Sequence, residues 1–133
     1  MSQENVKVVR RAAEAFNRGD LDAAVADAAP DIEYVATGAL PGFRGVFRGV
    51  EEYKRFLHWT SEEFDDPRGE PTEIIEAGDQ VVVGLTISGR GKQSGVETSW
   101  TIWQVWTFQE GKVVRGKGFA SREEALEAAG MSE

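Results

Sequence analysis

The sequence predicts an α+β fold in which helices gather on one face of a curved, largely antiparallel sheet. Apolar residues recur at helical spacing through about the first 64 residues, and then at the alternating spacing of strands through residue 119. Short turns separate the predicted strands, which indicates an antiparallel meander. A chain of 133 residues suffices for one well-packed core and is too short for two, so residues 1–133 are expected to form a single domain.

Two helices are expected at the N-terminus. Helical spacing of apolar residues predicts the first over residues 3–18, and Gly19 supplies a left-handed residue that ends it. The side chain of Asp20 can accept a hydrogen bond from the backbone of the next turn, so we expect it to cap a second helix. This helix is expected to run through about residue 28 and to be ended by Pro30.

The next segment is expected to hold a strand, a loop and a third helix. DIEYVA at residues 31–36 predicts a short strand. The glycine-rich residues 37–49 are too irregular for a helix or strand, yet they carry apolar side chains such as Phe43, so the loop is expected to fold inward over something apolar. A third helix is predicted from about residue 50 to 64, with the acidic residues 65–66 at its solvated end.

The C-terminal half is expected to hold four strands and a short helix. The strands are predicted at residues 72–77, 80–88, 97–109 and 112–119, with short turns between them. Ser121 followed three residues later by Glu124 forms a capping box, which predicts that the last helix begins there. Gly130 is the expected end of this helix.

Composition excludes several classes of function. The 23 acidic and 15 basic residues give a net charge of -8, which opposes binding to nucleic acid or to an anionic membrane. The chain has no cysteine, so disulfides, thiolate catalysis and zinc-thiolate sites are ruled out. No apolar run resembles a signal peptide or a membrane span, so a cytoplasmic protein is expected. No motif indicates a metal or a cofactor.

The strand at residues 99–108 (SWTIWQVWTF) carries the strongest indication of a site. Alternation places two sets of side chains on opposite faces: Trp100, Ile102, Gln104, Trp106 and Phe108 on one, and Ser99, Thr101, Trp103, Val105 and Thr107 on the other. The first face is almost wholly apolar with one amide. It is either a core in which Gln104 bonds to backbone, or a ligand pocket with one placed polar group. On the second face, Trp103 and Val105 are suited to a sheet-to-sheet homodimer contact.

Three segments resemble a known family in order along nearly the whole chain. RRAAEAFNRGDLDAAVADAAPDIEYVA, FRGVEEYKRFL and QVWTFQEGKVVRGKGFASREEALEAAG are similar to the SnoaL-like branch of the nuclear transport factor 2-like, or ketosteroid isomerase-like, superfamily. The last segment is the most specific and resembles short bacterial members of unassigned function. The resemblance implies a cone-shaped, strongly bent sheet wrapped by three helices, with a short C-terminal helix beside it. It also implies a homodimer through the convex sheet face.

The resemblance also implies catalytic positions, and few of them carry suitable residues. Alignment to ketosteroid isomerase places the family's tyrosine at Ala12, its base near Tyr34 and its protonated aspartate at Gln104. Alanine has no hydroxyl, and a tyrosine with a reference pKa of about 10 is a poor base at neutral pH. The carboxylates that epoxide hydrolases and cyclases of this superfamily use have no clear counterpart. Enzymatic activity is therefore left open.

Two residues with possible acid-base roles have ambiguous positions. His58 is the chain's single histidine, and its place in the third helix fits either a surface residue or a general base within a cavity. Glu33 and Tyr34 alternate on the first strand, so one of them is expected to face the cavity. If Tyr34 points inward, Glu33 is solvated.

Three functions fit these observations. The first is a cone that binds a small apolar, ring-containing metabolite or acts on it as an isomerase, cyclase or dehydratase. The second is a dimeric binding module without catalysis, and the third is a protein-interaction module whose cone is filled by side chains. Tyr34, His58 and Gln104 are the candidate catalytic residues. The candidate ligand contacts are Phe16, Phe43, Trp59, Trp100, Ile102, Trp106, Gly116 and Gly118. Gly116 and Gly118 are expected to leave room in the cavity.

Overall fold

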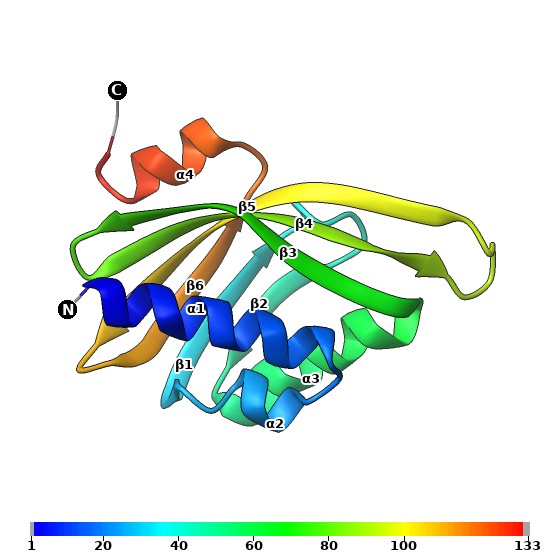
Figure 1. Ribbon diagram of the computed structural model, residues 1–133, viewed down its shortest axis with the longest axis horizontal. Helices are drawn as coiled ribbons and strands as arrows, with labels where there is room; N and C mark the ends of the chain where they lie inside the picture. The colour runs from blue at the N-terminus through cyan, green and yellow to red at the C-terminus, as the bar shows by residue number, and fades with distance from the viewer. Residues whose placement is uncertain (1, 132–133) are drawn as a thin grey trace.

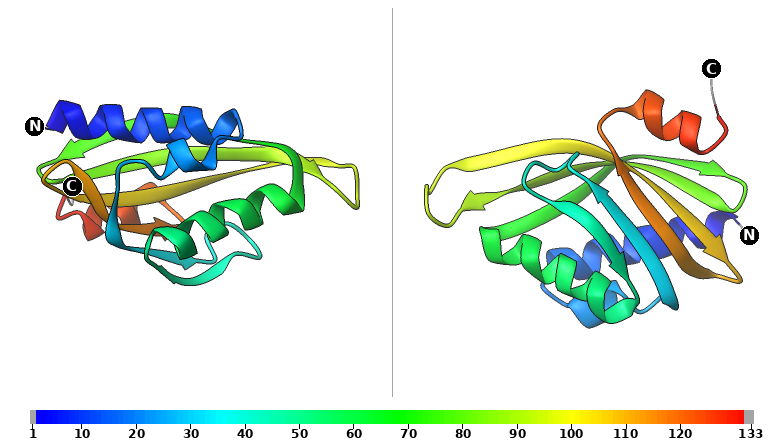
Figure 2. Two further views of the ribbon diagram at one scale, coloured as in Figure 1. Left: turned by 90° about the horizontal axis from the view of Figure 1, so that it is seen from below. Right: turned by 180° about the vertical axis from the view of Figure 1, so that it is seen from behind.

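Over the part of the chain that the structure describes, the protein has the predicted α+β architecture, with a bent six-stranded sheet and four helices packed against it (Figures 1 and 2). The computed structural model describes residues 2–131. The helices are α1 (Ser2–Asn17), α2 (Leu21–Ala24), α3 (Val50–Glu63) and α4 (Arg122–Ala128). The strands are β1 (Ala28–Thr37), β2 (Arg44–Arg48), β3 (Phe64–Ala77), β4 (Gln80–Gly91), β5 (Glu97–Gln109) and β6 (Lys112–Phe119).

The sheet is mixed, with strand order β2-β1-β6-β5-β4-β3. Strands β3 to β6 form the predicted antiparallel meander, and β2 pairs antiparallel with β1. Strands β1 and β6 run parallel, so the N-terminal part of the chain is joined to the meander through β6. The β4–β5 hairpin projects beyond the helices at the right of Figure 1.

Helices cover both faces of the sheet. Helices α1 to α3 lie against the concave face, and α4 lies on the opposite face (Figure 1). The expectation that all helices share one face is therefore wrong for α4. Val81, Val82 and Val83 are consecutive on β4 and at most 1% exposed, so both faces of this strand are covered. Ala125 and Leu126 of α4 pack over Val82.

The N-terminus of α4 is fixed by a cap and an ion pair. The Ser121 side chain accepts a hydrogen bond from the Glu124 backbone N–H at 3.2 Å, which confirms the predicted start of the helix. The Arg122 guanidinium donates to both carboxylate oxygens of Glu73 on β3, each at 3.0 Å. This fork of hydrogen bonds lowers the pKa of Glu73 and links the last helix to the edge strand.

The second helix is shorter than the sequence predicts. Asp20 caps it as expected, because its side chain accepts from the Ala23 backbone N–H at 3.0 Å. However, α2 has four residues and ends at Ala24, and β1 already begins at Ala28. The backbone N–H of Val113 on β6 donates to the carbonyl of Asp27 at 2.9 Å, so pairing with a distant strand overrides local helix propensity.

Pro30 therefore lies within β1 and does not end a helix. The register between β1 and β6 shifts between Ala28 and Glu33, which is where a residue without an N–H is tolerated.

Both edge strands include residues for which the sequence predicts a loop or the end of a helix. Residues 44–48, expected to be irregular, form β2 and pair with residues 33–37 of β1. The strand predicted at 72–77 begins already at Phe64, so Asp65 and Asp66 lie in β3 and not at a solvated helix end. Prolines 67 and 71 and two register shifts interrupt the pattern of β3. An edge strand tolerates such interruptions because one of its sides has no strand partner.

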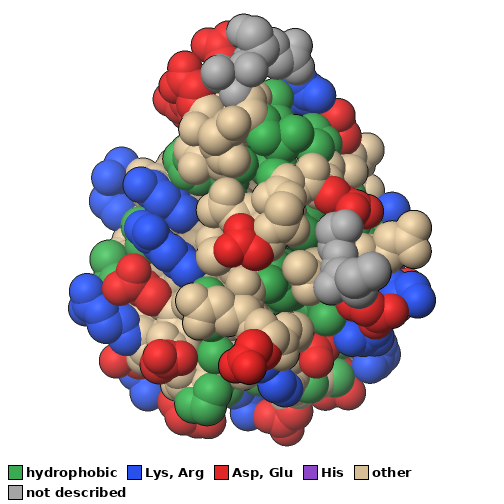
Figure 3. Space-filling view, turned by 90° about the vertical axis from the view of Figure 1, so that its left-hand side faces the viewer, with side chains coloured by type: hydrophobic (Ala, Val, Ile, Leu, Met, Phe, Trp, Pro, Cys, Tyr) green, Lys and Arg blue, Asp and Glu red, His purple; other side chains and the backbone are tan. Residues whose placement is uncertain are grey.

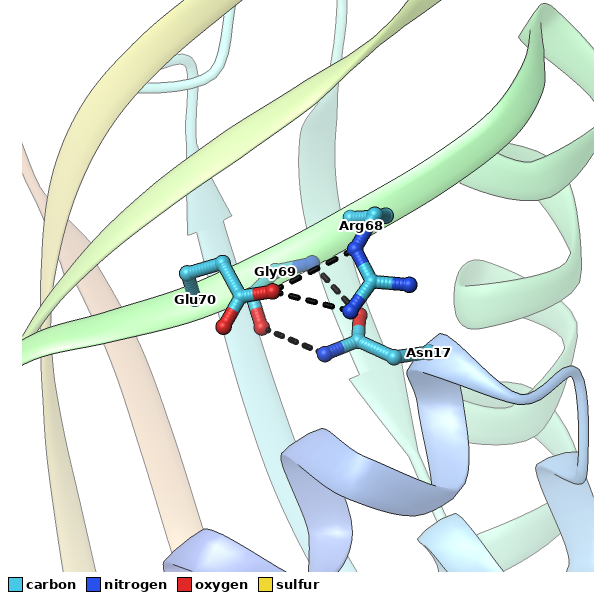
Figure 4. Close-up of polar contacts among 4 residues, drawn as sticks. All are labelled: Asn17, Arg68, Gly69 and Glu70. Atoms are coloured by element: carbon cyan, nitrogen blue, oxygen red, sulfur yellow. Dashed lines mark hydrogen bonds and ion pairs between the residues drawn. The ribbon is translucent and has the colours of Figure 1, made fainter.

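One side chain joins the end of α1 to β3 (Figure 4). Asn17 Nδ2 donates to the Gly69 carbonyl at 3.0 Å, and the Gly69 N–H donates to Asn17 Oδ1 at 2.7 Å. The amide thus pairs with the edge strand as a neighbouring strand would. Beside it, Arg68 donates to the Glu70 carboxylate. This contact holds the helix bearing Phe16 against the strand bearing Gly69, and both residues line the cavity described below.

Charges of both signs are spread over the surface. In Figure 3 acidic and basic side chains are interspersed, with Lys and Arg side chains gathered on the left of the view. On the outer face of the sheet, Arg48 and Arg115 lie 3.1 Å and 3.8 Å from the Glu33 carboxylate, which is solvent-accessible as expected when Tyr34 points inward. Within residues 2–131 no helix is long and apolar enough to cross a membrane.

The amide of Asn17 should contribute measurably to stability. Asn17→Ala leaves the N–H and carbonyl of Gly69 without these partners, so we expect a loss of about 1–3 kcal/mol in the free energy of unfolding, measured with urea. Asn17→Asp keeps an acceptor for the N–H but cannot donate to the carbonyl, and it should lie between the two. An Asn17→Ala protein as stable as the wild type would contradict this assignment.

Candidate functional site

A cavity of about 140 Å³ lies between the concave face of the sheet and helices α1 to α3. Its apolar walls include Val9, Ala12 and Phe16 of α1, Phe56 and Leu57 of α3, and Ile102 and Trp106 of β5. The alanine in the middle of the α1 face leaves space that a larger side chain would fill. An apolar cavity of about 150 Å³ can hold benzene. The present cavity therefore suits a molecule of about one ring with a small substituent.

One hydrogen-bonded cluster interrupts the apolar lining. The indole Nε1–H of Trp106 donates to Gln104 Oε1 at 3.1 Å. Gln104 Nε2–H in turn donates to Tyr34 Oη at 3.2 Å. The rings of Tyr34 and Trp106 stack with centroids 5.4 Å apart. All three residues line the cavity, so the polar group expected from the strand sequence is a chain of three side chains.

Gly116 explains why these two rings meet. In the sheet register it is the partner of both Tyr34 on β1 and Trp106 on β5. A Cβ atom there would lie 2.3 Å from the Trp106 ring and 2.8 Å from the Tyr34 ring. The space that a side chain at Gly116 would occupy is therefore filled by the two rings, so this glycine does not enlarge the cavity. Gly118 does line the cavity, and a Cβ there would make ordinary contacts at 3.6 Å and beyond.

Two hydroxyls and the carboxylate of the lining already have partners. The Thr37 hydroxyl donates to the Gly118 carbonyl at 3.0 Å, and the Thr60 hydroxyl donates to the Leu57 carbonyl at 2.7 Å. Asp27 is the one carboxylate among the described lining residues, and it lies 3.3 Å from the Arg11 guanidinium. Within residues 2–131, no group of three or more histidine or carboxylate side chains is arranged to hold a metal ion.

The two tyrosines of the cavity are kept protonated. Burial removes the water that would solvate a phenolate, so it raises the pKa of Tyr34, and the hydrogen bond from Gln104 opposes this only in part. Burial, and then repulsion from Tyr34, raise the pKa of Tyr53. Near neutral pH both phenols are therefore hydrogen-bond donors or acceptors and not bases.

Seven predicted site residues line the cavity: Tyr34, Gln104, Phe16, Phe43, Ile102, Trp106 and Gly118. Trp59 and Trp100 do not. Trp59 packs behind Phe43, with ring centroids 4.4 Å apart, and Trp100 packs against Phe64 near the projecting hairpin, with centroids 5.6 Å apart. Both are half-buried and pack against the core cluster. Trp100 lies toward the end of β5 that forms the projecting hairpin, away from the cavity. The predicted site residue Gly116 does not line the cavity either, because the rings of Tyr34 and Trp106 cover it.

His58 lies outside the cavity. Its side chain is 61% exposed, and Nε2 lies 3.6 Å from the Glu62 carboxylate one turn further along α3. The face of α3 toward the sheet carries Tyr53, Phe56 and Thr60, and helical geometry turns His58 away from it. Of the two positions that the sequence leaves open for His58, the structure shows the surface one, so His58 is not placed to act as a base in the cavity.

Some lining residues were not singled out from the sequence. Tyr53 and Phe56 lie on the apolar stripe of the third helix, which predicts burial but does not separate core from cavity. Leu40 belongs to the loop that was expected to fold inward, and it does so. Asp27 was missed because the second helix was predicted to pass through it.

The outer face of β5 is partly covered within the protomer. Val105, expected in a dimer contact, is 6% exposed and packs against Ala125 and Leu126 of α4. It is not free to meet a partner subunit, because the C-terminal helix occupies that place. Trp103 is half-buried, with its ring over Gly84. The homodimer itself stays a prediction.

Comparisons agree with this architecture. The family model of the SnoaL-like domain matches residues 9–116. An NTF2-like protein of unknown function from Burkholderia pseudomallei is 27% identical, with a TM-score of 0.78 over 93% of this chain and 95% of that chain. A candidate SnoaL-like polyketide cyclase from Jannaschia is 18% identical, with a TM-score of 0.77 over 99% and 94%. The comparison with curated proteins gave no match.

A matched pair of glycine substitutions tests the packing of the cluster. Gly116→Ala forces the rings of Tyr34 and Trp106 apart, so we expect a loss of about 1–3 kcal/mol in the free energy of unfolding. Gly118→Ala meets only ordinary contacts and should change stability by less than about 0.5 kcal/mol. Urea unfolding of both proteins measures the difference, and equal effects would contradict the packing described here.

Titration tests the buried phenols, because Tyr34 and Tyr53 are the chain's two tyrosines. Phenolate absorbance should stay absent at about pH 10, where a free tyrosine is half ionised. A pKa raised by folding stabilises the protein below the unfolded value, and this contribution is lost as pH rises toward the folded value. Phenolate should therefore form together with alkaline unfolding. Ionisation near pH 10 in the folded protein would show that the phenols are solvated.

Proposed function

We propose that this chain, which belongs to the SnoaL-like domain family, binds a small apolar, ring-containing molecule in the cavity beneath its sheet. The observation that carries the proposal is the lining, in which aromatic and aliphatic walls surround one hydrogen-bonded cluster. Ligand sites commonly combine such walls with a few placed polar groups. The volume of about 140 Å³ favours a molecule of about one ring.

Binding is favoured over catalysis by the state of the polar groups. Tyr34, Gln104 and Trp106 are neutral and hydrogen-bonded to one another. Proton abstraction needs a base, and the single carboxylate among the described lining residues, Asp27, is paired with Arg11. The geometry therefore supports recognition of a neutral molecule more directly than removal of a proton from it.

An isomerase, cyclase or dehydratase is the second candidate. Tyr34 favours it, because a neutral phenol in a water-poor cavity can stabilise negative charge that develops on a ligand oxygen. In such an enzyme Asp27 would have to act as the base. Asp27→Asn should then abolish turnover of the ligand that binds, while leaving its affinity largely unchanged.

A protein-interaction module is less well supported. That function predicts a cone filled by its own side chains, whereas open space of about 140 Å³ is present. A dimeric binding module is compatible with the cavity, since the sheet face on which the sequence predicts a dimer contact is opposite to the face that borders the cavity. Size measurement by light scattering would test the dimer directly.

Filling the cavity should abolish binding without harming the fold. Ala12→Leu adds three carbons to the cavity wall, so the affinity for the apolar probe α-methylstyrene should fall by at least about tenfold in calorimetric titration. The free energy of unfolding should stay equal or rise, because the new side chain buries apolar surface.

Ala128→Leu makes the same change on the exposed surface of α4 and should leave the affinity unchanged. If the wild type failed to bind monocyclic apolar probes, or if the Ala12→Leu protein bound them equally well, the proposed function would be overturned.

A further inference from the structure

We infer that Trp106 fixes the polarity of the cavity, meaning the direction in which the hydrogen bonds of the cluster run. As a result, Tyr34 presents its hydroxyl proton to the bound molecule and selects ring compounds that carry a carbonyl oxygen. This inference rests on the proposed binding function and specifies its ligand class. The hydrogen-bonding capacities of three side chains carry it, since each constrains the next.

The first constraint is the indole of Trp106. Its Nε1–H can only donate, and it lies 3.1 Å from the side-chain amide of Gln104. An amide oxygen and an amide nitrogen differ little in shape, so hydrogen bonding decides which way the group points. The opposite orientation would place an N–H of Gln104 against the N–H of the indole. The oxygen of Gln104 must therefore face Trp106.

The second constraint follows at Tyr34. With its oxygen turned to Trp106, Gln104 directs an N–H at the phenol oxygen, 3.2 Å away. Tyr34 accepts this bond, so its own proton must point elsewhere. Of the side chains in residues 2–131, Gln104 is the hydrogen-bonding partner that the structure gives to Tyr34, and the nearby Thr37 hydroxyl is directed at the Gly118 carbonyl. The proton is left for a molecule in the cavity that Tyr34 lines.

This polarity determines what the cavity accepts. A ligand that places an acceptor oxygen at Tyr34 gains a hydrogen bond that a hydrocarbon of the same shape cannot make. The remaining walls are largely apolar, so a ring compound with a single carbonyl suits the site. The net value of one such bond predicts a preference of about tenfold.

Acetophenone and α-methylstyrene form a matched pair of probes, because they differ only in a C=O against a C=CH₂ group. The wild type should bind acetophenone about tenfold more tightly in calorimetric titration. The carbonyl stretch of bound acetophenone should shift to lower frequency than in a hydrocarbon solvent. Tyr34→Phe should abolish both the preference and the shift while keeping the affinity for α-methylstyrene.

Trp106→Phe tests the positioning role. Without the indole donor, the Gln104 amide can turn and accept the Tyr34 proton. The carbonyl shift should then shrink although Tyr34 is still present, and α-methylstyrene corrects for the altered shape of the cavity. A shift that persists in Trp106→Phe would overturn the role of Trp106.

The outcomes separate the two proposals. If neither probe binds the wild type, the proposed function fails. If both bind equally and the carbonyl band does not move, the cavity stands and the inferred polarity is overturned. The infrared measurement on the wild type decides this point even if a variant fails to fold.

Discussion

The absence of a side chain at Gly116 is the constraint on which the cavity depends. Strand β6 lies between β1 and β5, and at this register its glycine lets Tyr34 and Trp106 meet across it. Their closeness allows one amide, Gln104, to bond to both polar ends at once. A larger residue would separate the rings and break this chain of hydrogen bonds. The register of the strands thus determines the shape of one cavity wall and the direction of the hydrogen bonds along it.

The hydrogen-bonded cluster of the cavity is neutral although the chain carries a net charge of -8. Charged side chains of the described residues lie largely on the surface, where water solvates them and some form ion pairs such as Arg48–Glu33. Burial keeps Tyr34 protonated, and His58 lies on the solvent side of α3. The chemistry available to a ligand is therefore hydrogen-bond donation and apolar contact, and it is this combination that favours binding of a neutral ring compound.

Helices cover both faces of the sheet, and this determines which parts of each face stay accessible. The valines of β4 are buried on both sides, beneath α1 to α3 on one and beneath α4 on the other. The C-terminal helix consequently occupies the part of the outer face where Val105 lies, and the ion pair between Arg122 and Glu73 holds it there. On the inner face, Asn17 holds α1 against β3, which keeps the helix that bears Phe16 over the cavity.

The sequence by itself determined the features that depend on local pattern. The fold class, the extents of β5 and β6, the capped start of α4 and the two faces of β5 all follow from periodicity and capping. Tertiary structure alone decided the short α2, the strand β2 and the first half of β3, because pairing with distant strands overrode local preference. It also decided which aromatic rings line the cavity and where the Tyr34 proton points. Those properties depend on the register of β1, β6 and β5, which local sequence does not encode.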